Sequence, residues 1–157
     1  MNLKPVAFTV SANNKINILT TPIKIYSTKD FNKNFNNKKD IYTALWDTGS
    51  TMTVISSELA KELCLDPAGE IEAETASGKY KTNKYILSIS LPNHLNIENI
   101  MVSSGKLMPG IDLLIGMDII GLGDFAITNK DNKTMFSFRF PSVNNIDFVK
   151  NNKIWFW

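Results

Sequence analysis

The sequence is poor in the residues that build disulfides, metal centres and nucleophilic triads. Its 157 residues include one cysteine, Cys64, and one histidine, His94. A single cysteine excludes an internal disulfide and fits a reducing compartment, so we expect a cytoplasmic protein. One histidine and one cysteine are poor ligands for a transition-metal site, and His94 lies in a Pro-Asn loop that offers no serine or cysteine triad. We therefore expect no metal and no cofactor.

Strong charge and long apolar segments are also lacking. The net charge is +2, with 20% charged and 43% hydrophobic residues, which is ordinary for a soluble domain and too weakly basic to argue for nucleic acid. The polar segment 27–40 is interpreted as a solvated hairpin loop. No run approaches the roughly 18 apolar residues of a membrane span, and the N-terminal residues lack the apolar region of a signal peptide. We expect neither a nucleic-acid nor a membrane partner.

Short stretches with alternating apolar and polar residues dominate what is present. One domain spanning residues 1–157 is the simplest organisation for this length. Many short strands at close spacing are typical of an all-β sandwich or barrel. The predicted strands are 6–10, 16–19, 22–26, 42–46, 52–56, 70–76, 80–91, 97–102, 124–128 and 134–140.

Two short helices are expected among these strands. The first covers about 57–65, with Ser56 or Ser57 as its cap and a proline after its end. Cys64 falls in its apolar pattern and is predicted to be a small core residue. The second covers about 117–121, between two glycines.

An acidic residue stands where an apolar strand is expected to end. Residues 44–51 read ALWDTGST, and a carboxylate after an apolar run is costly unless it is paired or hydrogen-bonded. A turn, 75-TASG-78, follows between two predicted strands. Later, 113-LLIGMDII-120 is an apolar strand broken by a glycine and followed by the second helix. Asp-Thr-Gly alone is common in turns, but the three motifs in this order are more specific.

Together these motifs resemble the retropepsin-like aspartic proteases, most closely the bacterial or phage-borne branch. The resemblance covers about residues 22–140. It implies a closed, mostly β, acid-protease barrel with one or two short helices. It also implies an aspartic endopeptidase that cleaves an extended polypeptide beside apolar side chains. In such enzymes two carboxylates share a water and one proton, one acting as general base and the other as general acid.

The chain contains only one Asp-Thr-Gly, and one aspartate cannot supply both roles. The need for two equivalent carboxylates predicts a homodimer with the site on its two-fold axis. Residues 1–21 and 141–157 are candidates for dimer contacts, with the strands near 6–19 and 134–140 entering a shared sheet. The terminal Trp155-Phe156-Trp157 is expected to pack on the body or on the partner, or to dock in a cleft.

The resemblance also implies roles for single residues. Asp47 would be the catalytic aspartate, and Thr48 would send its hydroxyl to the partner's loop. Gly49 would permit the tight turn, and Ser50 would reach the outer carboxylate oxygen. The expected substrate-binding residues are Leu45, Val54 and Leu114 in the pockets and Ala76, Ser77 and Gly78 at the flap tip.

The chain departs from the retroviral pattern at two positions. Retroviral members usually pair an acidic residue where Thr51 stands with an arginine where Met117 stands. Losing both partners together is physically coherent because no unpaired charge remains. Asp118 is predicted to cap the short helix, with a catalytic role as a remote second choice.

Two other functions remain open from the sequence. The alternative is a catalytically silent retropepsin-like module that binds an extended peptide or scaffolds a complex. A further possibility is an enzyme activated by dimerisation at high local concentration, or by trimming of residues before about 20.

Overall fold

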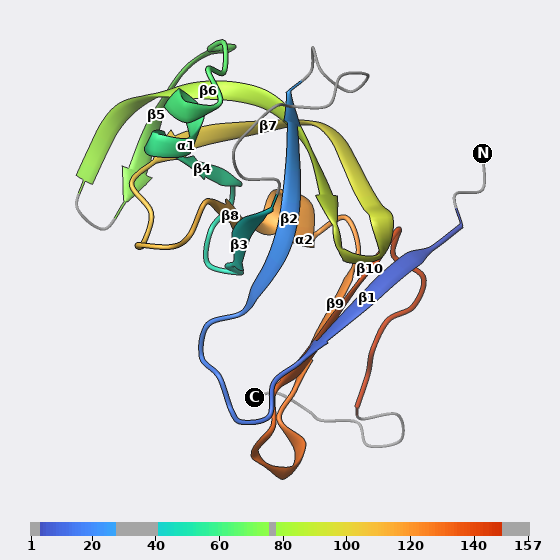
Figure 1. Ribbon diagram of the computed structural model, residues 1–157. Helices are drawn as coiled ribbons and strands as arrows, with labels where there is room; N and C mark the ends of the chain where they lie inside the picture. Colours follow the sequence, from blue (N-terminus) through green and yellow to red (C-terminus); the bar gives the residue numbers. More distant parts are fainter. Residues whose placement is uncertain (1–3, 28–40, 76–77, 149–157) are drawn as a thin grey trace, which may run out of the picture.

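The computed structural model describes residues 4–27, 41–75 and 78–148, and within these it is built almost entirely of strands (Figure 1). The strands are β1 (Val6–Ser11), β2 (Thr20–Ser27), β3 (Tyr42–Trp46), β4 (Val54–Ser56), β5 (Gly69–Thr75), β6 (Gly78–Leu91), β7 (Leu95–Gly105), β8 (Leu113–Ile115), β9 (Asp124–Thr128) and β10 (Met135–Phe140). Two short helices, α1 (Ser57–Glu62) and α2 (Met117–Ile120), and two 3-10 turns, η1 (Pro92–His94) and η2 (Lys130–Asn132), interrupt them.

Six strands close into a barrel in the order β2-β3-β8-β4-β7-β6, and β6 pairs back with β2. The long strand β2 makes this closure possible because it divides its length between two partners. Thr20–Ile23 pairs with β3, whereas Lys24–Ser27 pairs with β6. β5 adds a hairpin to the outer side of β6. The predicted closed, mostly β, acid-protease barrel with short helices is confirmed.

The barrel core follows from the two-residue period of the strands. Alternate residues point inward, so the inward side chains are apolar and the outward ones are more exposed. β3 shows the pattern clearly, because Tyr42, Ala44 and Trp46 are buried while the residues between them are half-buried. The barrel interior is completed by fully buried aliphatic side chains, among them Ile23, Ile55, Leu87, Leu113 and Ile115.

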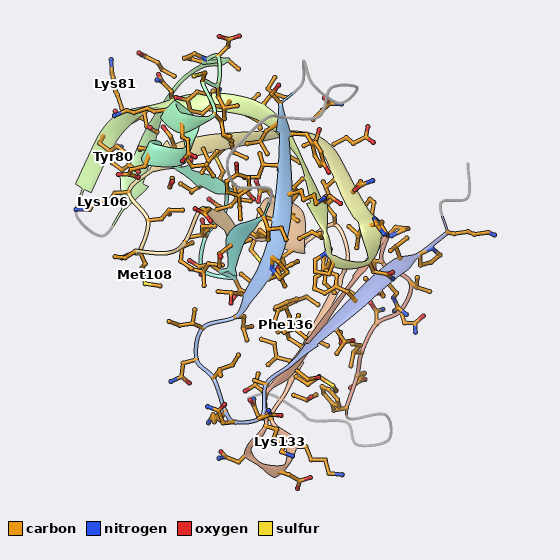
Figure 2. The ribbon with its side chains drawn as sticks, in the orientation of Figure 1. Tyr80, Lys81, Lys106, Met108, Lys133 and Phe136 are labelled. Atoms are coloured by element: carbon orange, nitrogen blue, oxygen red, sulfur yellow. The ribbon has the colours of Figure 1, made fainter. Side chains whose placement is uncertain are left out.

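A second, three-stranded antiparallel sheet in the order β1-β10-β9 lies against one end of the barrel (Figure 1). Its inner face carries Phe8, Phe136 and Phe138, which surround Trp46 of the barrel. Figure 2 shows Phe136 between the two sheets. The segments that the sequence offered for a shared dimer sheet therefore pair with each other inside one chain.

The connection before the barrel corrects one predicted strand. Residues 16–19 form no strand, although Ile16 and Ile18 alternate with the polar Asn17 between them. The chain uses this stretch to pass from the three-stranded sheet to β2, and Ile18 is 50% exposed. This stretch is joined to β3 by a backbone hydrogen bond, which Trp46 N–H donates to the Leu19 carbonyl at 2.9 Å.

Helix α1 confirms its predicted cap and corrects its predicted end. The Ser56 hydroxyl accepts a hydrogen bond from Leu59 N–H at 3.0 Å, as an N-cap does. The helix stops at Glu62, and Cys64 adopts a left-handed conformation with φ 47°. That conformation turns Cys64 to solvent, so it is exposed rather than a core residue. The buried residues of the segment are Leu59, Ala60 and Leu63.

Several predictions concern residues outside those described. They are the loop at 28–40, the flap-tip residues Ala76 and Ser77, and the aromatic end of the 149–157 tail. Among the described residues, no helix has the length and apolar character needed to cross a membrane.

Candidate active site

Asp47 follows β3 directly and is carried by the closed barrel. Its backbone N–H donates to the Ile115 carbonyl of β8 at 3.0 Å, continuing the parallel β3–β8 pairing by one residue. The chain then turns, with Ser50 N–H donating to the Asp47 carbonyl at 3.2 Å. The Asp47 carboxylate is half-buried, and its Oδ1 accepts the Gly49 N–H at 2.8 Å. The barrel thus fixes the carboxylate by backbone bonds on both sides.

The three residues after Asp47 make different contacts. The Ser50 hydroxyl donates to the Met52 carbonyl at 2.7 Å, so the expected bond to the carboxylate is replaced by the Gly49 N–H. Thr48 is exposed, and among the described residues its hydroxyl has no hydrogen-bond partner. A side chain at Gly49 would begin 3.1 Å from Asp47 Oδ1, so glycine keeps the carboxylate uncrowded.

A second clamp holds the turn to α2 and adds to the role predicted for Asp118. Both carboxylate oxygens of Asp118 accept from Thr53, one from its N–H and one from its hydroxyl, each at 2.8 Å. The N-cap of α2 is Gly116, which makes no side-chain capping bond. Asp118 therefore joins two segments 65 residues apart. Its Oδ1 also accepts the Ile119 N–H of α2 at 3.0 Å, so it binds a first-turn amide of its own helix although it does not occupy the N-cap position.

The turn and the start of α2 touch through a glycine. A Cβ on Gly116 would lie 2.6 Å from the carbonyl carbon and oxygen of Met52, a distance that real side chains do not adopt. Gly116 N–H also donates to the Thr53 hydroxyl at 3.2 Å, and Met117 N–H donates to the Ser50 carbonyl at 2.8 Å. Gly116 is thus needed for the close approach that these bonds require.

Three of the predicted pocket residues lie side by side next to this turn. Leu45 on β3 pairs with Leu114 on β8, and Leu114 pairs with Val54 on β4. All three are half-buried and point away from the barrel interior. We call this surface, made by Leu45, Leu114 and Val54, the apolar floor.

The turn that the sequence assigns to the flap tip connects the antiparallel strands β5 and β6. Gly78 begins β6 opposite Thr75 and has φ 115°, a conformation that favours glycine. The outer face of the hairpin is charged, with Lys79 and Glu72 3.1 Å apart. At its base the Thr82 hydroxyl lies 2.7 Å from the Ser104 carbonyl and 2.8 Å from the Ser104 hydroxyl, which fixes the hairpin to β7.

Other features of the described residues lie apart from Asp47. A surface pocket of about 270 Å³ is lined by β2, the end of β6 and η1, including His94, and contains none of the predicted site residues. No three His, Cys, Asp or Glu side chains of the described part of the chain are arranged to hold a metal ion.

Sequence reasoning missed the residues that position the turn through tertiary contacts. Thr53 is fully buried and is bonded to Asp118, and Trp46 donates from its indole N–H to the Thr21 hydroxyl at 3.0 Å. A threonine six residues after the aspartate gives no local signal of a partner near residue 118. Trp46 was recognised only as the last apolar residue of its strand.

The chain matches a known family over more than half of its length. A family model described as "gag-polyprotein putative aspartyl protease" matches residues 32–121, which contain the Asp47 turn and the LLIGMD segment. No curated protein sequence matches the chain.

Two solved structures are similar to it in fold. A retropepsin-like aspartic protease from Rickettsia conorii has a TM-score of 0.52 and 14% identity, covering 87% of this chain and 95% of that one. The EIAV protease in complex with the inhibitor HBY-793 has a TM-score of 0.50 and 16% identity, covering 66% of this chain and 86% of that one.

Proposed function

The chain belongs to the gag-polyprotein aspartyl protease family, and on that premise we propose that it is an aspartic endopeptidase active as a homodimer. The observation that carries the proposal is the Asp47 carboxylate, half-buried on a backbone-fixed turn beside the apolar floor. A fixed carboxylate next to an apolar surface can hold a water against an extended peptide. The substrate is a polypeptide with apolar side chains near the cleaved bond.

The second carboxylate has to come from outside this chain's own turn. Asp118 is occupied by the two groups of Thr53. Asp112 accepts Thr43 N–H at 2.8 Å and is tied to β3. Both carboxylates serve to hold strands in place, so a second copy of Asp47 is the natural partner.

The surface around the turn suits contact with an identical copy. Continuing the β2–β3 register by two residues places Ile18 opposite Asp47 on one side. Met117 flanks the turn on the other side through its bond to Ser50. Ile18 is 50% and Met117 42% exposed, and both are apolar. Since Thr51 is also uncharged, the copies would meet through apolar contacts around the two carboxylates.

In this dimer the two Asp47 side chains share one proton and bind one water between them. The ionised carboxylate takes a proton from the water as its oxygen adds to the peptide carbonyl carbon. The protonated carboxyl donates its proton to the carbonyl oxygen, which gives a tetrahedral diol. Proton transfer to the nitrogen then breaks the C–N bond and releases an amine and a carboxylic acid.

The first test combines solution mass with cleavage of a peptide library. We expect the parent to be a dimer near twice 17.6 kDa at the concentrations where it cleaves. Asp47→Asn should remove nearly all cleavage and leave the dimer intact. Asp131→Asn is the matched control, because Asp131 is an exposed carboxylate of η2 and should be silent.

A mixing experiment tests whether the site is shared. When equal amounts of parent and Asp47→Asn exchange subunits, about a quarter of the pairs carry two aspartates. Activity should therefore fall to about a quarter of that of the same total amount of parent. A fall to only one half would mean that each subunit works alone, which contradicts the shared site. Peptide binding without cleavage would favour the silent binding module.

A further inference from the structure

Tyr80 connects the flap hairpin to the apolar floor. It lies on β6 opposite Ala73 of β5, two residues from the tip-side end of the strand. Its neighbours Lys79 and Lys81 point to the outer face, where Lys79 pairs with Glu72. By the two-residue period of a strand, Tyr80 points to the opposite face, toward the floor.

The Tyr80 hydroxyl lies beside a glycine of β7. A Cβ built on Gly105 would lie 3.3 Å from Tyr80 Oη and 3.1 Å from Val54 Cγ1. Gly105 pairs with the end of β4, close to Val54 in the floor. The phenol ring therefore reaches across from the hairpin to the β4–β7 junction, where a side chain at residue 105 would make tight contacts with Tyr80 and Val54.

The Tyr80 hydroxyl is available for a ligand. No other described residue hydrogen-bonds it, and Tyr80 is 41% exposed. By contrast, the hydroxyl of Thr82, two residues nearer the hairpin base, is hydrogen-bonded to the carbonyl and the hydroxyl of Ser104. Figure 2 shows Tyr80 on the same side of the molecule as Met108, in the loop after β7. An exposed phenol over apolar side chains offers one donor and a bulky wall.

We propose that Tyr80 is a specificity-determining residue of the peptide cleft. Its ring fills the space over Val54 and Gly105, so the substrate side chain bound there must be small, such as alanine or valine. Its hydroxyl donates to a carbonyl of the extended peptide. This inference rests on the proposed function, because it assigns the peptide to the cleft beside Asp47.

The test compares three variants on a peptide library in which each position carries Ala, Val, Leu or Phe. Tyr80→Ala should raise kcat/KM for Leu or Phe at one position by about tenfold relative to Ala there. Tyr80→Phe should keep the parent's size preference but lower affinity by about three- to tenfold, because one hydrogen bond is lost. Lys81→Ala, on the outer face of the same strand, should match the parent.

Gly105→Ala provides an independent check of the same contact. In the parent it should displace the phenol and change the size preference. In the Tyr80→Ala background that change should disappear, because the ring is gone. If Gly105→Ala changes the size preference equally in both backgrounds, the contact between residue 105 and Tyr80 is not the cause of that change.

The outcomes separate this inference from the proposed function. If Tyr80→Ala and the parent have the same size profile, or if Lys81→Ala shifts it equally, the assignment of Tyr80 is wrong although proteolysis stands. If the parent cleaves nothing, the same library is measured for binding to the Asp47→Asn chain by calorimetry. Binding whose size preference depends on Tyr80 then supports the inference and rejects catalysis, and the absence of any binding rejects both.

Discussion

The barrel and the three-stranded sheet are held in place by different kinds of interaction. The Asp47 turn of the barrel is fixed by directional bonds to Ile115, Ser50 and Gly49, with Thr53 bound to Asp118 behind it. The three-stranded sheet is attached chiefly by aromatic packing, beside one hydrogen bond of 2.9 Å from the Asn93 side-chain amide of η1 to the Ala7 carbonyl of β1. Trp46 is stacked on Phe125 with ring centroids 5.4 Å apart and planes 7° apart, and three further phenylalanines surround it.

This difference follows from what each region has to do. A hydrogen bond loses strength within a few tenths of an ångström and a few tens of degrees, so it can fix a carboxylate. Apolar packing has no preferred direction, so it can attach a whole sheet but cannot orient one side chain. Trp46 belongs to both regions, because it packs in the aromatic cluster and directly precedes Asp47.

Removing Trp46 should damage both regions at once and give the largest effect. Trp46→Ala deletes the ring around which the phenylalanines pack, and we expect a loss of about 3–5 kcal/mol in the free energy of unfolding. Urea denaturation measures it. Activity should fall too, since the neighbouring turn loses its support. Wild-type stability in Trp46→Ala would mean that the two sheets are not joined through this residue.

Two glycine substitutions should separate stability from catalysis. A Cβ at Gly116 would lie 2.6 Å from the Met52 carbonyl, and one at Gly123 would lie 2.2 Å from the Arg139 carbonyl in the three-stranded sheet. Each alanine should cost about 3 kcal/mol or more, because backbone has to move. Only Gly116→Ala should also lower kcat strongly in the fraction that remains folded. Equal residual kcat in both variants would contradict the division between the regions.

Breaking the clamp behind the turn should have an intermediate effect. Asp118→Ala leaves the buried N–H and hydroxyl of Thr53 without their acceptor, which costs about 1–3 kcal/mol. Because Thr53 follows the turn, kcat should fall more than KM rises. Asp118→Asn restores one acceptor and should recover part of the stability. If Asp118→Ala lost activity while its stability stayed unchanged, the result would instead support a catalytic role for Asp118.

The smallest effect is expected at Asp124 in the three-stranded sheet. Hydrogen bonds from the Ser142 hydroxyl, Val143 N–H and the Arg139 guanidinium hold its pKa well below the ordinary carboxyl value. A lowered folded-state pKa adds stability above the unfolded pKa of about 3.9, and this is lost as the pH falls below it.

Asp124→Asn should therefore melt at a lower temperature than the parent near neutral pH, and the difference should shrink in acid. Thermal unfolding between neutral pH and the acid range measures it. Cleavage should be unchanged, since the hydrogen bonds of Asp124 are to Arg139, Ser142 and Val143 and none of them reaches the Asp47 turn. A difference between the two proteins that grew in acid would reverse the sign and contradict these contacts.

Local patterns in the sequence were enough for most of the strands and for the Asp47 turn. The predicted bounds of β3 and β9 match the structure to the residue. In β3 the burial alternates as a half-buried strand requires, because successive side chains point to opposite faces. The motif around Asp47 indicated the family. Alternation failed at residues 16–19, where the chain needed a connection, and the helical pattern failed at Cys64, where a left-handed residue ends α1.

Contacts between distant residues could not be predicted in the same way. The residues around Asp118 give no sign that it will bind Thr53, and those around Tyr80 give no sign that it will lie beside Gly105. Each pair comes together only when the barrel closes. The sequence alone determined a β-rich chain with one catalytic-type aspartate, since periodicity and turn chemistry are local. Tertiary structure decided which groups hold that aspartate and which sheet packs against the barrel. Strand pairing and close approach act between segments far apart in the chain, so local patterns do not reveal them.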